Sequence, residues 1–132
     1  MYTCITGGYD SLKPVRNKGK IFDFICFSDK SIPNAKDLGW TVRPIPAELK
    51  NLSKVKQQRI VKICPHRYLP EYKASIWIDG SFEVKNDLYD IMAFVDFTKT
   101  PIWTRRHPDR KCIYDEIKTC KRMKIVDDSL CD

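Results

Sequence analysis

The order of apolar and polar residues along the chain predicts strands that alternate with helices. Apolar, β-prone runs lie at residues 2–6, 23–27, 40–43, 75–78 and 100–104. Apolar residues at helical spacing predict helices over residues 47–64, 88–95 and 111–124. Pro65 ends the first helix, and Asn86 caps the second. This alternation indicates an α/β fold with a largely parallel sheet.

Short polar turns follow the first, second and fourth of these strands. They are Gly7-Gly8-Tyr9-Asp10, Ser28-Asp29 and Asp79-Gly80-Ser81. Ligands of open α/β sheets bind beyond the carboxyl ends of the strands, so these turns predict the binding edge. Asp79 is the sharpest candidate, because its carboxylate directly follows a buried strand and the next residue is a glycine. It is predicted to bind a metal ion or a substrate, and the alternative is that it only begins a turn.

The other two turns carry weaker signals. Gly7-Gly8 can bring backbone N–H groups close to a phosphate or a base. It is neither the G-x-G-x-x-G of a dinucleotide fold nor a P-loop, so neither class is predicted. Asp29 is a candidate ligand for a base or a ribose, with a helix or turn cap as the alternative.

Basic residues form two candidate groups. Arg59, Lys62 and His66 fall at intervals of three and four, so they share a face and can neutralise a diphosphate if the helix persists. The second group surrounds His107 and contains Arg105, Arg106 and Arg110. For both groups the alternative is a solvated basic surface.

Glu116, in the last predicted helix, is a distant candidate for a general base. A metal site made from His107 and Cys112 has weak support, because two ligands of mixed type are too few.

The composition supports one folded domain spanning residues 1–132. The chain is 42% hydrophobic and 31% charged, which is enough apolar surface for a core and excludes a disordered chain. No apolar run could span a bilayer and the first residues lack a signal-peptide pattern, so a cytosolic protein is expected. The six cysteines are scattered without a C-x-x-C pair, which favours reduced structural thiols.

The net charge of +7 is unevenly distributed. Residues 50–73 contain seven basic residues and one acidic residue, and residues 99–124 contain nine and three. Residues 74–98, between them, contain one basic and five acidic residues. This pattern suggests a site that gathers phosphate-bearing partners around a carboxylate centre.

Five blocks, in order, carry a resemblance over nearly the whole chain. They are Tyr2-Thr3-x-Ile5-Thr6-Gly7-Gly8-Tyr9-Asp10, Asp23-Phe24-x-x-Phe27-Ser28-Asp29, Arg59-x-x-Lys62-x-x-Pro65-His66, Tyr72-x-x-Ser75-Ile76-Trp77-Ile78-Asp79-Gly80-Ser81 and His107-x-x-Arg110-x-Cys112-Ile113-Tyr114-x-Glu116. The chain resembles a glycosyltransferase-like family, formerly a domain of unknown function, whose members include plant turgor- and mucilage-related proteins and bacterial proteins linked to capsular polysaccharide. The resemblance implies a Rossmann-like sheet of the GT-A type.

The resemblance also implies roles for individual residues. The nucleoside would contact Thr6, Gly7, Tyr9 and Asp29, and the diphosphate would contact Arg59, Lys62 and His66. Asp79 would stand for the first carboxylate of an Asp-x-Asp motif that binds a divalent cation, Mn²⁺ or Mg²⁺. Further substrate contacts are expected from Gly8, Asp10, Ser81, His107 and Arg110, and catalytic roles from Asp79, His66 and Glu116.

This sequence departs from the family pattern in two respects. Ser81 stands where Asp-x-Asp has its second carboxylate, which leaves fewer oxygen ligands for a metal. The family's domain also continues beyond the position of Asp132, so we expect a short or truncated form whose acceptor half is largely missing.

The function implied by the resemblance is transfer of a hexose from a nucleoside diphosphate sugar to a surface polysaccharide or another glycan acceptor. One alternative is a non-catalytic nucleotide-sugar-binding module that assembles with a partner chain or with a second copy. A basic nucleic-acid binder is the weakest alternative, because no known nucleic-acid motif occurs. The expected location is cytoplasmic, with peripheral contact at the inner face of the membrane as an option.

Overall fold

The computed structural model describes residues 1–17, 19, 21–86, 88–96, 98–104 and 106–124. The chain falls into two compact units, Met1–Met92 and Ala93–Asp132, and each is considered by itself. That residues 1–132 act as a single domain stays a prediction.

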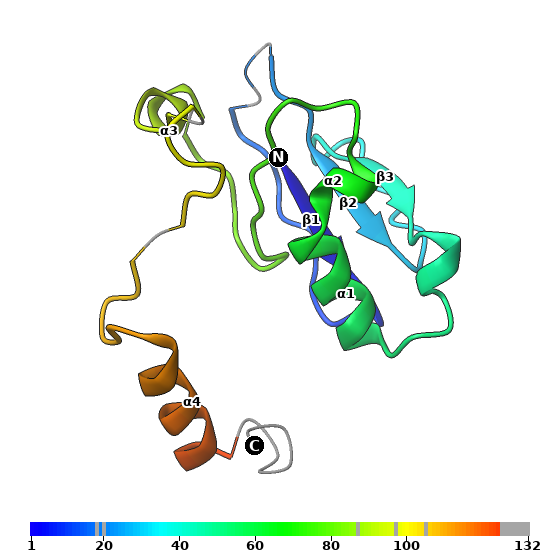
Figure 1. Ribbon diagram of the computed structural model, residues 1–132. Helices are drawn as coiled ribbons and strands as arrows, with labels where there is room; N and C mark the ends of the chain where they lie inside the picture. Colours follow the sequence, from blue (N-terminus) through cyan, green and yellow to red (C-terminus); the bar gives the residue numbers. More distant parts are fainter. Residues whose placement is uncertain (18, 20, 87, 97, 105, 125–132) are drawn as a thin grey trace. The chain divides into compact units, whose positions relative to one another are not determined.

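In the described part of the first unit, three parallel strands form a sheet (Figure 1). They are β1 (Tyr2–Ile5), β2 (Ile25–Ser28) and β3 (Thr41–Pro44), in the order β1-β2-β3. Every residue of β1 and β2 is buried, as in parallel strands that are covered on both faces. The predicted α/β class, with a mostly parallel sheet flanked by helices, is confirmed.

The predicted strand at residues 75–78 is present as a short bridged segment beside β1. The Tyr2 N–H donates to the Ile76 carbonyl (2.8 Å), and the Ile78 N–H donates to the Tyr2 carbonyl (3.1 Å). Tyr2 and Trp77 form a parallel bridge. The chain therefore crosses from β3 to the opposite side of β1, so the topological switch point lies between β1 and this segment.

The predicted helix at residues 47–64 is interrupted. A 3₁₀ turn, η1 (Ala47–Leu49), precedes α1 (Lys54–Ile63), which begins after Ser53 because the Ser53 hydroxyl accepts the Lys56 N–H. The helix α1 ends at Ile63, because a residue before proline is disfavoured in the helical region. Pro65 then starts a separate turn, α2 (Pro65–Tyr68).

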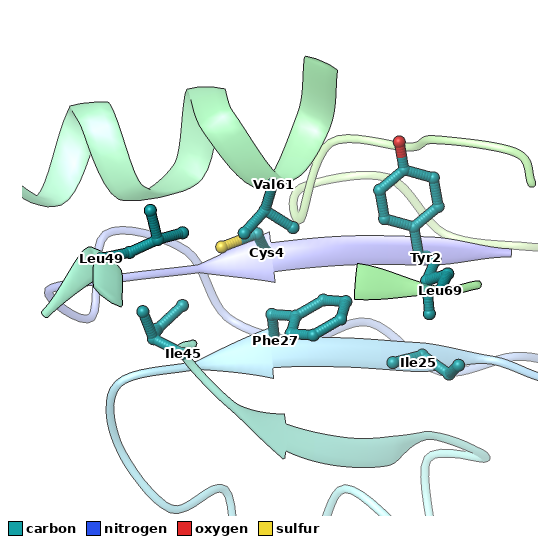
Figure 2. Close-up of a cluster of buried hydrophobic side chains, with 8 residues drawn as sticks. All are labelled: Tyr2, Cys4, Ile25, Phe27, Ile45, Leu49, Val61 and Leu69. Carbon is teal, nitrogen blue, oxygen red and sulfur yellow. The ribbon is translucent and has the colours of Figure 1, made fainter. Parts of the chain in front are cut away.

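Side chains that alternate along the strands feed two clusters of buried residues on opposite faces of the sheet. Figure 2 shows the cluster between the sheet and α1, formed by Tyr2, Cys4, Ile25, Phe27, Ile45, Leu49, Val61 and Leu69. The second cluster consists of Ile5, Phe24, Cys26, Ala35, Trp40, Val84 and Leu88. Because side chains of a strand point alternately to its two faces, adjacent residues such as Cys4 and Ile5 serve different clusters.

The later part of the chain differs more from the sequence prediction. Helices α3 (Tyr89–Ala93) and α4 (Ile113–Arg122) lie inside the ranges predicted as helical and are shorter. The predicted strand at residues 100–104 is wrong, since these residues are exposed and form no strand in the described part of the chain. A strand needs a neighbour for its backbone hydrogen bonds, and an apolar run alone does not supply one.

Within the described ranges, no helix has the length and apolar character needed to cross a membrane. Cys4, Cys26, Cys64 and Cys112 are free thiols, and Cys131 lies outside the described residues.

Candidate functional site

A left-handed turn connects the end of β1 to the loop that follows it. Gly7 and Gly8 have φ angles of 69° and 71°, a conformation that strains any residue with a Cβ atom. The Tyr9 N–H donates to the Thr6 carbonyl across the turn. The glycine pair is therefore required by the backbone, whatever ligand binds beside it.

Asp29 holds this turn in place. The Gly7 N–H donates to both oxygens of Asp29, at 3.0 and 3.2 Å, and the Lys54 ammonium lies 2.8 Å from one of them. The Thr6 hydroxyl donates to the Lys54 carbonyl (2.9 Å). The Asp29 carboxylate thus joins the ends of β1 and β2 to the start of α1.

Two opposing effects set the acidity of Asp29. Burial by itself would raise the pKa of this carboxyl, but the Lys54 ammonium and the Gly7 N–H outweigh burial, so the pKa lies below its ordinary value. Asp29 is ionised at neutral pH and already hydrogen-bonded within the protein. Its predicted contact with a nucleoside stays a prediction.

A pocket of about 330 Å³ opens at the carboxyl ends of β1 and β2. Its lining includes two predicted site residues, Gly8 and Asp10, and four polar residues that sequence reasoning missed: Ser11, Lys30, Ser31 and Asn34. Three of these four come from the loop after β2. The rule that ligands bind after the strand ends would have selected that loop, although it does not select individual side chains.

Gly80 connects this pocket to the Asp79 turn. A Cβ atom at Gly80 would lie 2.9 Å from Ile5 Cγ1 and 3.1 Å from Asp10 Cβ. Ile5 and Asp10 both line the pocket, so the Asp79-Gly80 turn packs directly against the pocket wall. This close approach, rather than a special φ angle, is what requires a glycine.

Asp79 lies at the centre of a small polar cluster at the switch point. One oxygen, Oδ1, accepts the indole N–H of Trp77 (3.0 Å) and lies 3.4 Å from the Lys62 ammonium. The side chain of Asp79 is 49% exposed, so a ligand can reach it. Trp77 is a further residue that the sequence pattern did not select for the site, since an aromatic residue in an apolar strand is typical of a core position.

The other predicted diphosphate ligands are distributed over two helices. Arg59 and Lys62 lie on α1, whereas His66 lies on α2, because the helix does not persist through Cys64. The prediction that all three residues share one helical face required a continuous helix, and α1 ends at Ile63, before His66. Arg59, His66 and Ser81 are exposed.

Three predicted site residues lie together in the second unit. The Arg110 guanidinium lies 2.6 Å from His107 Nε2 and forms an ion pair with Glu116 (2.7 Å). The Cys120 thiol donates to the same carboxylate (3.4 Å). The cluster brings His107, Arg110 and Glu116 together, whereas Arg105 lies outside the described residues.

The residues around Asp79 do not fit a resident divalent cation. No group of three or more His, Cys, Asp or Glu side chains that could hold a metal occurs among the described residues. Asp79 Oδ1 is already engaged by an indole N–H and an ammonium group, and Ser81 is no carboxylate. A hard divalent cation held by protein groups alone requires several oxygen ligands, which this set does not supply.

A family model described as "TOD1/MUCI70, glycosyltransferase-like domain" matches residues 35–132. The matched range contains α1, Trp77, Asp79 and the His107 cluster, and it begins after β1 and β2. No curated protein and no solved structure matches the chain.

Proposed function

Because the chain belongs to the TOD1/MUCI70 glycosyltransferase-like domain family, we propose that it transfers a hexose from a nucleoside diphosphate sugar to a glycan acceptor. The family membership supports the class of reaction. The donor, the polysaccharide acceptor and a cytoplasmic location with peripheral membrane contact are parts of the proposal.

One observation carries this proposal: the pocket and Asp79 meet at the switch point of the sheet. Ile5 lines the pocket and is also the nearest neighbour of Gly80, so the pocket wall and the Asp79 turn are in contact. Parallel α/β sheets bind their ligands at this place. A pocket of about 330 Å³ is at the lower end of the size range of small-molecule sites.

In the proposed complex, the nucleoside occupies the pocket and the diphosphate extends toward Lys62 and Asp79. The short polar side chains of Ser11, Ser31 and Asn34 can exchange hydrogen bonds with a base or a ribose. Gly8 has no side chain to obstruct the ligand. Arg59 and Lys62, three residues apart on α1, offer positive charge to the phosphates.

The proposed reaction breaks the bond between the anomeric carbon and the diphosphate oxygen, and the electron pair leaves with that oxygen. The acceptor hydroxyl oxygen forms the new bond to the anomeric carbon, and its proton passes to a base, for which His66 is the candidate within the first unit. Fixed positive charge next to the departing diphosphate stabilises the charge that develops there.

Calorimetric titration with UDP, GDP, ADP and CDP tests the donor pocket. We expect saturable binding of one of them, weakened about tenfold or more in Asn34→Leu, which removes a polar group from the pocket lining. Asn51→Leu is the matched control, because Asn51 is exposed and is not part of the lining. If none of the four nucleotides binds, the proposal is wrong.

A turnover assay separates an enzyme from a binding module. The corresponding sugar nucleotide is incubated with the protein and an oligosaccharide acceptor, and release of the nucleoside diphosphate is followed. We expect release that is lost in Asp79→Ala and kept in Asp90→Ala, an exposed carboxylate on α3. Binding without release would instead support the non-catalytic module.

A further inference from the structure

Lys62 belongs to a three-residue cluster that fixes the position of its ammonium group. The ammonium lies 5.1 Å from the centroid of the Trp77 ring and 3.4 Å from Asp79 Oδ1. The Trp77 indole N–H donates to the same oxygen (3.0 Å). Two different attractions, one from an aromatic face and one from a carboxylate, therefore hold the same cation.

Tyr2, on β1, contacts both Trp77 and Lys62 and so holds the cluster against the sheet. Its ring packs edge-on against Trp77, with centroids 5.2 Å apart, and its hydroxyl donates to the Lys62 backbone carbonyl (2.8 Å). Tyr2 is itself buried in the core between β1 and α1 (Figure 2). Both the backbone and the side chain of Lys62 are thus tied to the sheet, so little freedom is lost when the ammonium binds a ligand.

We propose that Lys62, held by Trp77 and Asp79, is the cation that neutralises the donor diphosphate, and that donor binding needs no divalent metal. This inference rests on the proposed function. In this arrangement, Asp79 positions Lys62. The exposed part of the Asp79 side chain can still contact the sugar.

The arrangement of charges favours an anion over a second cation at this place. The two oxygens of a carboxylate are bonded to one carbon, so a divalent cation on Asp79 Oδ2 would lie close to the ammonium on Oδ1. Arg59, one turn earlier on α1, adds further positive charge. Asp10, which packs on Gly80, raises the number of nearby carboxylates to two, and the described residues contain no group of three or more side chains that could hold a resident metal by themselves.

Titration of the full chain with UDP, GDP, ADP and CDP, in excess EDTA and then in excess MnCl₂, tests the inference. We expect the bound nucleotide to have dissociation constants that agree within about twofold in the two conditions. Mn²⁺ alone, followed by the electron paramagnetic resonance signal of the free ion, should show no saturable binding. Nucleotide binding that requires Mn²⁺ would overturn the inference and leave the proposed function intact.

Substitution of Lys62 gives the second readout. Lys62→Met keeps an unbranched side chain of similar length and removes the charge, and we expect it to weaken nucleotide binding about tenfold or more in EDTA. Lys62→Arg should restore most of that binding. Lys56→Met, at an exposed position of the same helix, is the matched control and should bind like the wild type.

These outcomes separate the two hypotheses. Unchanged binding in Lys62→Met, with thermal unfolding showing that the variant is folded, overturns the role of Lys62 while the proposed function stands. If no nucleotide binds in either EDTA or MnCl₂, both the proposed function and this inference fail.

Discussion

Replacing Gly80 with alanine should destabilise the first unit and deform the pocket at the same time. The new Cβ would lie 2.9 Å from Ile5 Cγ1, 3.1 Å from Ile5 Cδ1 and 3.1 Å from Asp10 Cβ. Carbon atoms pack best at about 3.5–4.0 Å, so each of these neighbours must move by several tenths of an ångström. Ile5 cannot easily do so, because it is buried, 4% exposed, and β-branched.

The size of the effect follows from this overpacking. Extra methyl groups in a well-packed site cost about 1–3 kcal/mol. For a unit the size of Met1–Met92, each kcal/mol lowers Tm by about 4–8 °C. We therefore expect Gly80→Ala to lower Tm by about 4–24 °C. Nucleotide affinity should fall as well, because Ile5 and Asp10 line the pocket.

Thermal unfolding followed by circular dichroism measures the first effect, and Ser81→Ala, at the exposed next residue, is the control. A double-mutant cycle with Ile5→Ala tests the cause, since removing Cγ1 and Cδ1 should reduce the cost of Gly80→Ala by about 1 kcal/mol or more. A Tm change below about 1 °C, or an unchanged cost in the Ile5→Ala background, would refute the close packing of this turn.

Three further predictions concern titratable groups. The pKa of Asp29 is lowered in the folded state, so its stabilising effect is present above the ordinary carboxyl pKa and is lost as the pH falls through the folded-state value. Asp29→Asn should therefore flatten the acid side of a Tm–pH profile, and an unchanged profile would argue against the ion pair with Lys54 and the charged hydrogen bond from Gly7. Burial raises the pKa of Tyr2 to about 12, so the stability it confers is full below the ordinary phenol pKa and declines as the pH rises toward 12. Tyr2→Phe should lose about 0.5–1.5 kcal/mol at neutral pH, measured by urea unfolding, and should show less further loss in alkali. Burial likewise raises the pKa of Cys4 and Cys26 to about 12, whereas Cys112 is exposed, so iodoacetamide labelling mapped by mass spectrometry should modify Cys112 before Cys4 and Cys26. Early labelling of Cys4 or Cys26 in the folded protein would contradict their burial.

Local sequence signals predicted the framework of the first unit. Apolar runs marked β1 and β2, because strands buried on both faces need continuous apolar residues. The same kind of apolar run wrongly predicted a strand at residues 100–104, where no neighbouring strand occurs among the described residues. Strand pairing is a contact between distant segments, which a local pattern does not contain.

The location of the candidate site could be predicted from the sequence, whereas most of the contacts between its side chains could not. The sequence alone predicts that polar turns follow apolar runs, that one such turn begins at Gly7-Gly8, and that Asp79 directly follows an apolar run, because these features depend on neighbouring residues. Tertiary structure decided that Asp29 binds the Gly7 N–H and Lys54, and that Lys62 lies between Trp77 and Asp79. These contacts join residues that are 15 to 25 positions apart in the sequence. Their geometry is set by the crossover from β3 through α1 to the far side of β1, which no single segment of the chain specifies.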